Sequence, residues 1–399
     1  MTNGLELGDV YGATIERIKA QDGDKSRLGM TALMWVSHAE RPLQANELCH
    51  ALAVQLGSTD FDGGNIPSMS TLVNCCQGLI AVDKEASIVR LIHFTLQEYL
   101  SAHLDLFIKP HSAMAEICLT YLNSQQVKAL STTHSPDVRN TPFLQYCSVY
   151  WGVHAKRELS EEGKSLALEL LKEHYSQIST ELLLAHTNLY LKRHDTCASL
   201  SGLHCASFFG IAEVVVALIE VGGSDINREG YQGCTPLSWA AYNGHEEVVK
   251  ILLGCGEVHP NKVDTLGRTP LLRAALNGHE GVIKLLLARE DASPDKPDAD
   301  GQTPLLFAAE RGYEGVVKIL LGREEVNPDR PSIFGSTPLL CAARAGHDGI
   351  VKILLGREEV NPDTVNRWGG TPLSYATKRG HEKVVEILQS RKVVAPGTI

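Results

Sequence analysis

The feature that most constrains the fold is a repeat that fills the second half of the chain. Five Thr-Pro dipeptides follow one another at intervals of 34 residues, starting at Thr235, Thr269, Thr303, Thr337 and Thr371. One further step back leads to Ser201-Gly202. A fixed period of this size indicates a stacked repeat protein, because a single unit cannot bury its own apolar face. We therefore expect six units, starting near residues 201, 235, 269, 303, 337 and 371.

The units share the pattern T-P-L-x-x-A-A-x-x-G-H-E-x-V-V-K-I-L-L. The Thr hydroxyl can cap a helix start, and Pro suits the first helical position, where its missing N–H has no helical partner. The paired alanines let helices approach closely, and the Gly ends the first helix. The apolar run predicts an amphipathic second helix, and turn residues such as Asn327-Pro328-Asp329 predict a loop and a finger between units.

This pattern resembles the ankyrin repeat, whose signature T-P-L-H-x-A is nearly complete here. The fourth position is mostly Leu or Ser, and only His204 matches the family residue. The family period is about 33 residues, and the extra residue falls in the loop after the second helix. The resemblance covers about half of the chain and implies a mainly α fold, an α-solenoid with β-hairpin fingers that binds proteins.

The first and last units depart from the pattern as the ends of an array should. Unit one has Ser201-Gly202 in place of Thr-Pro and a very apolar second helix around Val214–Val216, which suits packing against a preceding domain. Unit six has Gln389 in place of a core Leu, which predicts a capping repeat whose outer face meets water.

Residues 1–110 predict a different arrangement, several helices followed by a β-hairpin, which is the order of a winged helix. Pro42 separates two of the helices, because Pro is excluded from a helix interior. The expected helices are Tyr11–Gln21, Lys25–Glu40, Gln44–Leu56, a short one ending near Gly78 and one over His93–Leu100, and the expected strands are Leu79–Val82 and Ile88–His93.

Three motifs in this region resemble the winged-helix segment of fungal NACHT–ankyrin proteins, which are signal-transduction NTPases. They are Tyr11-x-x-x-Ile15-x-Arg17-Ile18, Arg41-Pro42-Leu43 and His93-Phe94-x-x-x-Glu98-Tyr99-Leu100. A related winged helix takes its name from a GPI-inositol deacylase, of which it is not the catalytic part. In the NACHT family a nucleotide-binding domain precedes the winged helix, so this chain looks like a member without its NTPase and effector parts.

The region that follows resembles the helical segment joining winged helix to ankyrin array in the same family. The matching motifs begin at Ala115-Glu116-Ile117-Cys118 and at Pro142-Phe143-Leu144. Together the resemblances imply a winged-helix domain at 1–110, a helical linker domain at 111–195 and six ankyrin repeats at 196–399.

Composition points to a cytoplasmic protein without membrane contact. No apolar run reaches the roughly 18–20 residues that a membrane helix needs, and the start MTNGLELGDV has neither the basic region nor the apolar core of a signal peptide. The ten cysteines include no C-x-x-C pair, which predicts reduced and mostly buried thiols, the vicinal Cys75 and Cys76 among them.

No motif for catalysis or metal binding is convincing. The nearest approach to a phosphate-binding loop, Gly23–Ser26, lacks the upstream Gly and the Gly-Lys step, and G-x-S-x-G is absent. A calcium loop aligned on Gly301 would place Lys296 and Phe307 where carboxylates are needed, so a finger tip is favoured. The repeated Gly-His-Glu offers one His per unit (His245, His279 and His381), which favours helix-end capping over a metal. We expect no enzyme activity, small-molecule substrate, cofactor or metal.

The charge of the winged-helix segment disfavours DNA binding. Residues 1–110 contain 8 Lys and Arg against 13 Asp and Glu, and the expected reading helix Ser68–Gln77 has neither Lys nor Arg. A nucleic-acid surface needs both positive charge and side chains that reach the bases. The charge therefore argues against a nucleic-acid ligand.

In ankyrin proteins, partners usually meet the finger tips and the concave face formed by the first helices. By that resemblance, two sets of positions here are candidates for partner binding. The apolar residues at the finger tips are Tyr231, Leu266, Ile333, Phe334 and Trp368. The groove positions after the paired alanines are apolar in early units (Phe208, Tyr242, Leu276) and basic in later ones (Arg311, Arg344, Lys378, Arg379). Exposed anchors of this kind are typical of interfaces, although each tip side chain can also pack on the neighbouring finger.

The sequence therefore predicts a non-enzymatic protein-interaction module that binds a partner on its concave ankyrin surface, with a separate NACHT-type NTPase as one candidate partner. Two alternatives remain open. One is a DNA-associated regulator that uses the winged helix, and the other is a truncated receptor without independent function.

Overall fold

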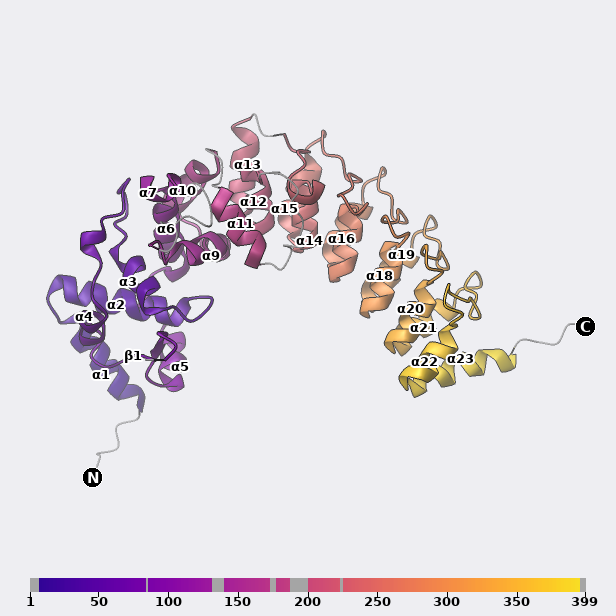
Figure 1. The fold of residues 1–399 in the computed structure, drawn as a ribbon, viewed down its shortest axis with the longest axis horizontal. Helices are drawn as coiled ribbons and strands as arrows, with labels where there is room; N and C mark the ends of the chain where they lie inside the picture. The colour runs from indigo at the N-terminus through magenta and orange to yellow at the C-terminus, as the bar shows by residue number, and fades with distance from the viewer. Residues whose placement is uncertain are drawn as a thin grey trace, which may run out of the picture. The chain divides into compact units, whose positions relative to one another are not determined.

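The chain forms two compact units, Met1–Asp195 and Thr196–Ile399, which are described separately below (Figure 1). The computed structural model describes residues 7–83, 85–130, 140–172, 177–186, 200–222 and 225–394, so the expected domain boundary at 195/196 lies outside the described residues. None of the helices in these ranges is long and apolar enough to cross a membrane.

The first part of the first unit has the element order that the sequence predicted, helices followed by a hairpin and a further helix. The helices are α1 (Leu7–Lys19), α2 (Gly23–His38), α3 (Ala45–Ala53), α4 (Met69–Cys75) and α5 (Phe94–Ala102), with short 3₁₀ turns at Gly63–Asn65 and Leu104–Leu106. Strands β1 (Ile80–Val82) and β2 (Val89–Leu91) pair antiparallel, with Ala81 opposite Arg90. Within the described residues this is the only sheet. Cys75 and Cys76 are buried, as predicted.

A bundle of helices follows in the same unit and shares its core with the winged helix. It consists of α6 (Pro110–Asn123), α7 (Gln125–Lys128), α9 (Leu144–Arg157), α10 (Glu161–Lys172) and α11 (Gln177–His186). The fully buried Trp35 of α2 packs edge-on against Phe143 and Tyr146, with ring centroids 5.4 and 5.6 Å apart. The two segments that the sequence analysis assigned to separate domains therefore pack as one compact unit.

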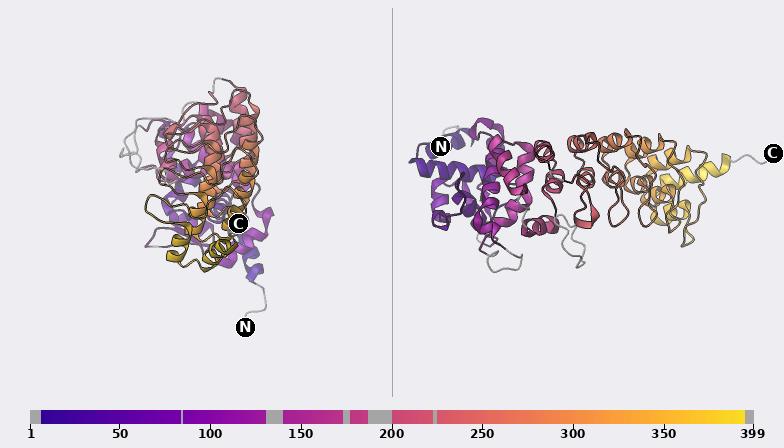
Figure 2. Two further views of the ribbon diagram at one scale, coloured as in Figure 1. Left: turned by 90° about the vertical axis from the view of Figure 1, so that its right-hand side faces the viewer. Right: turned by 90° about the horizontal axis from the view of Figure 1, so that it is seen from above.

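The second unit is a stack of helix pairs, one pair in each of the six expected units (Figures 1 and 2). The first helices are α12 (Gly202–Phe209), α14 (Pro236–Tyr242), α16 (Pro270–Asn277), α18 (Pro304–Arg311), α20 (Pro338–Ala345) and α22 (Pro372–Arg379). The second helices are α13 (Ala212–Glu220), α15 (Glu246–Gly254), α17 (Glu280–Leu287), α19 (Glu314–Leu321), α21 (Asp348–Leu355) and α23 (Glu382–Val394). First helices pack on first helices and second on second, which buries the paired alanines completely.

The predicted Thr-Pro helix starts and most of the predicted glycine helix ends are present in the array. The hydroxyl of the Thr before every first helix from α14 to α22 accepts the backbone N–H three residues on, at 3.1–3.3 Å. Every first helix except α14 ends at a glycine with left-handed backbone, for example Gly346 at φ 85°. Helix α14 is capped by Asn243, one residue before the glycine. In unit six Gln389 is exposed, as expected of a capping repeat.

The His of the Gly-His motif forms a bond between units, which the sequence did not predict. Its ring Nε2 lies 2.8–3.1 Å from a backbone oxygen at the end of the preceding first helix, in the pairs His245–Phe208, His279–Tyr242, His347–Glu310 and His381–Arg344. The expected helix-end capping is therefore present, but it acts on the neighbouring unit. The close approach also requires the glycine that ends the first helix of the preceding unit. A Cβ at Gly244, for example, would lie 2.5 Å from the ring of His279 in the next unit.

A second link joins the fingers. The tip N–H of each finger donates to the tip carbonyl of the finger before it, in the pairs Thr265–Gln232, Ala299–Leu266, Ile333–Asp300 and Arg367–Phe334, at 2.9–3.0 Å. Each finger is a hairpin-like turn closed by two backbone hydrogen bonds, such as Asp298 N–H to Gln302 O and Gly301 N–H to Asp298 O, both at 3.0 Å. Asp298 lies in a finger turn, as expected, and its carboxylate accepts two backbone N–H groups there.

A buried ion pair interrupts the apolar core of the array. Arg273 of α16 donates to Asp264 of the finger through Nε at 3.0 Å and Nη2 at 2.5 Å, and both side chains are almost fully buried. The same guanidinium lies 2.9 Å from the sulfur of Cys234 and 5.7 Å from the ring centroids of Trp239 and Tyr242. In unit six the corresponding positions hold a neutral pair, Asn366 and Tyr375, whose side chains are hydrogen-bonded at 3.0 Å.

We predict that residues 196–399 fold without the first unit, because the His-to-carbonyl bonds and the bonds between fingers all lie inside this segment. Circular dichroism of the fragment should show a helical spectrum and a single cooperative melt. A fragment that is unfolded at 20 °C would show that the array depends on residues 1–195.

We predict that Arg273→Ala lowers the free energy of unfolding of the array by about 3–5 kcal/mol, because it leaves the buried Asp264 carboxylate without its partner. The matched control is the double variant Asp264→Asn/Arg273→Tyr, which copies the neutral pair of unit six and should recover more than half of the loss. Urea unfolding of all three proteins measures this, and equal losses in the two variants would contradict the argument.

Candidate protein-binding surface

The groove candidates lie at the C-terminal ends of the first helices, in equivalent places from unit to unit. Their backbone is fixed by the array, since the carbonyls of Phe208, Tyr242 and Arg344 each meet the His ring of the next unit. Their side chains differ freely from unit to unit. The backbone of the array therefore holds a row of different side chains at equivalent positions, one set per unit.

At the apolar end of the row, the candidate side chains also pack on one another. Phe208 lies edge-on to the buried Trp239, with ring centroids 5.5 Å apart, and Trp239 in turn contacts Tyr242 at 6.3 Å. Phe208, Tyr242 and Leu276 are all half-buried. This end therefore offers a partly covered aromatic surface.

At the basic end, the candidates divide into two kinds. The guanidinium of Arg344 donates to Glu310 at 2.6 Å, so an acid within the array already compensates its charge. Arg311, Lys378 and Arg379 are exposed and form no ion pair with any residue that the structure describes. The sequence treated these four residues as equivalent, but their environments leave three unpaired cations.

The tip candidates also differ in exposure. Tyr231 is half-buried, Leu266 and Ile333 are exposed, and Trp368 is the most exposed, at 64 %. Phe334 is half-buried because the Trp368 ring stacks on it, with centroids 5.8 Å apart and ring planes 19° apart. The sequence left open whether tip side chains pack on neighbouring fingers. Here Phe334 packs against Trp368 of the next finger, while the Trp368 ring stays exposed to solvent.

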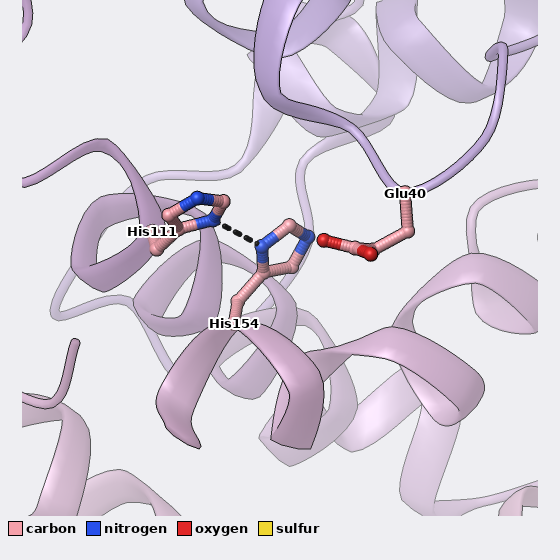
Figure 3. Close-up of side chains that lie close together, drawn as sticks. All are labelled: Glu40, His111 and His154. Carbon is pink, nitrogen blue, oxygen red and sulfur yellow. Dashed lines mark hydrogen bonds between the residues drawn. The ribbon is translucent and has the colours of Figure 1, made fainter. Parts of the chain in front are cut away.

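Outside the array, a polar cluster in the first unit contains the side chains that come nearest to a metal site. Glu40 follows α2, His111 lies on α6 and His154 on α9, and one potential ligand atom from each falls within 4.8 Å of the others. Nδ1 of His111 and Nδ1 of His154 share a hydrogen bond of 2.8 Å (Figure 3). Residues this far apart in the sequence carry no spacing signal, so the sequence analysis missed them.

The environment of these side chains favours a hydrogen-bond network over a metal site. Glu40 and His111 lie on opposite sides of the His154 ring (Figure 3). Both nitrogens of His154 are in use, since Nε2 lies 2.9 Å from the Tyr146 hydroxyl. Arg157 binds both carboxylate oxygens of Glu40, and its guanidinium lies 3.4 Å from Nε2 of His111. A divalent cation would sit beside this fixed positive charge, which opposes its binding.

Burial disfavours the protonated form of the histidines in this cluster. His154 is fully buried, and burial, with the neighbouring His111 and Arg157, lowers its pKa to about 3. Burial also lowers the pKa of His111 and of His38, whose ring centroid lies 5.7 Å from that of His111. The folded first unit therefore resists protonation at these sites, whereas the unfolded chain does not.

We predict that the first unit loses stability as the pH falls from about 6.5 towards about 3, because the unfolded chain then binds a proton that folded His154 excludes. Between pH 6.5 and 5, a histidine that stays neutral in the fold costs about 2 kcal/mol. Urea unfolding followed by tryptophan fluorescence measures the slope. His154→Gln should reduce the slope, while the exposed His259→Gln should not, and equal slopes in all three proteins would contradict the assignment.

Comparison with known proteins agrees with these two halves. The family model described as GPI inositol-deacylase, winged helix domain, matches residues 16–107. The model for ankyrin repeats (3 copies) matches residues 167–264, 256–332 and 324–395, and so begins inside the expected linker segment.

A search of curated proteins found no match. Among solved structures, the chain is similar to the crystal structure of the human ASB11 ankyrin repeat domain, with 29 % identity over 48 % of this chain and 83 % of that one, at a TM-score of 0.43. Because the ankyrin matches cover more than half of the sequence, the chain belongs to the ankyrin-repeat family, and a winged-helix domain of the GPI-inositol-deacylase type precedes its repeats.

Proposed function

We propose that this protein is a non-enzymatic, cytoplasmic interaction module whose ankyrin array binds a partner protein on the finger tips and the concave face of the first helices. The observation that carries the proposal is the set of exposed apolar and cationic side chains on a rigid frame, at equivalent positions of successive units. A folded protein gains little stability from an exposed Trp368 or from the unpaired Arg311, Lys378 and Arg379. A binding surface gives these side chains a use.

The first unit provides the context of the proposal. Its motifs resemble the winged-helix and helical segments of NACHT–ankyrin signalling proteins, so we propose a winged-helix segment at 1–110 and a helical segment at 111–195 that act with an NTPase on another polypeptide. In this scheme the ankyrin array is the sensor arm, and the first unit transmits its state.

The DNA-associated alternative receives no support from any side chain on the expected reading helix. In the structure this helix is α4, Met69–Cys75, which contains neither Lys nor Arg. Its N-terminal end is formed by Ser68, Ser70 and Thr71, whose hydroxyls hydrogen-bond to one another. Such a helix offers a phosphate backbone no countercharge.

We predict that the full chain, used as bait in its native cells, enriches at least one protein that depends on the ankyrin surface. The surface variant Leu276→Ala/Arg311→Ala/Trp368→Ala removes one side chain each from the apolar groove, the basic groove and the tips. It should reduce recovery of that protein at least tenfold, by quantitative mass spectrometry. Losses of about 2 kcal/mol or more are typical when buried interface anchors are truncated.

The matched control is Lys250→Ala/Lys284→Ala, which changes exposed residues on the second helices α15 and α17. This control should recover the partner as well as the unchanged protein does. If the surface variant also retains every partner, the binding site lies off the ankyrin surface and the proposal fails.

A further inference from the structure

The finger tips of units five and six form an exposed aromatic surface, here called the tip patch, made of Ile333, Phe334, Val365, Arg367 and Trp368. Ile333, Val365 and Trp368 are 52 %, 56 % and 64 % exposed. Trp368 stacks on Phe334, and the Arg367 guanidinium lies 5.7 Å from the Phe334 ring centroid. Three large apolar side chains in solvent, beside a stacked cation, are unusual on one pair of turns.

The backbone beneath the tip patch is held rigidly. The side-chain oxygen of the buried Asn366 accepts the N–H groups of Trp368 and Gly370 at 3.1 and 2.9 Å. Its amide group donates to the Tyr375 hydroxyl, and Arg367 N–H donates to Phe334 O at 2.9 Å. A ligand that covers Trp368 therefore orders little new backbone, which lowers the entropic cost of binding.

The charge around the tip patch is positive, although the whole chain has a net charge of −10. Arg367 is exposed at the tip itself, and the exposed Lys378 and Arg379 end the first helix of the same unit. Arg311 occupies the equivalent groove position of unit four. The acid in the row, Glu310, is already paired with Arg344. Three exposed acids lie near these cations in the sequence, Asp300 at the tip of unit four, Asp363 two residues before Val365, and Glu382 three residues after Arg379. The four cations outnumber them.

The spacing of the two features sets the length of a ligand. Helix α22 separates the tip patch from Lys378 and Arg379, and its eight residues span about 12 Å at roughly 1.5 Å per residue. An extended peptide covers that length with about four residues. A single short segment can therefore place an aromatic side chain on Trp368 and carboxylates near the two cations.

We propose that the tip patch, together with Lys378 and Arg379, binds an acidic segment of a partner protein that carries one aromatic anchor about four residues from its carboxylates. This inference rests on the proposed function and narrows it to one end of the array and one partner chemistry. The aromatic anchor provides most of the affinity, and the carboxylates steer association and set its salt dependence.

The test selects ligands from a random twelve-residue peptide library displayed on phage, with the full chain as target. The enriched peptides should combine Asp or Glu with one aromatic residue three to six positions away. A selected peptide without Trp should shift the tryptophan emission of the protein to the blue, since Trp35, Trp151 and Trp239 are already buried and Trp368 is the exposed one.

Affinities are then measured by fluorescence anisotropy with the labelled peptide. Trp368→Ala should weaken binding at least tenfold at every salt concentration, and Lys378→Ala/Arg379→Ala should weaken it several-fold at low salt only. Lys284→Ala is the control and should change nothing. Because Trp368 is exposed, the variants should keep the melting temperature of the unchanged protein.

Each other outcome is decisive. Enriched peptides that are not acidic, or that bind Trp368→Ala unchanged, would overturn the tip-patch proposal while leaving protein binding elsewhere on the array intact. No enrichment above the unselected library would also overturn the tip-patch proposal, while the proposed function is decided separately by the bait experiment with the surface variant.

Discussion

The fold of the second unit depends on the bond between a His ring and the last carbonyls of the neighbouring first helix. This bond recurs wherever the Gly-His motif recurs, and it satisfies helix-end carbonyls that would otherwise need water. It also requires the left-handed glycine, whose missing side chain makes room for the ring. Together with the backbone bonds between fingers, it links each unit that carries the motif to the unit before it. In unit four, where Tyr313 replaces the His, the backbone bond between fingers remains.

In the array, the residues that stabilise the fold differ from the residues that are candidates for partner binding. Caps, alanines, glycines and His rings hold the backbone, so the groove and tip side chains can change without loss of the fold. Arg273 is the exception, because it brings a charge into a position that holds Phe307 or Cys341 in other units. The array tolerates it because Asp264, in the neighbouring finger turn, neutralises it at 2.5 Å. The buried charge of Arg273 is thus compensated by an acid of the same repeat unit.

The sequence predicted the features that depend on neighbours in the chain. Helix starts at Thr-Pro, most first-helix ends at Gly and the β-hairpin of the first unit follow from local patterns, and all three are present in the structure. It did not predict pairings between distant residues, such as His111 with His154 or Trp35 with Phe143. Nor did it separate Arg344 from Arg311, because whether a cation is free depends on the acid that folding places beside it. The partner-binding roles stay predictions.

That separation of Arg344 from Arg311 changes what the basic row is able to recognise. Without the contact between Arg344 and Glu310, the basic groove positions would offer four equivalent cations, which would attract any polyanion. With Arg344 neutralised, the unpaired charge is concentrated in unit six, beside the stacked Trp368 and Phe334, and only Arg311 lies outside it. A ligand that uses charge alone gains little there, since exposed ion pairs contribute only about 0–1 kcal/mol each. Selectivity must therefore come from a ligand that meets the aromatic stack and the cations together.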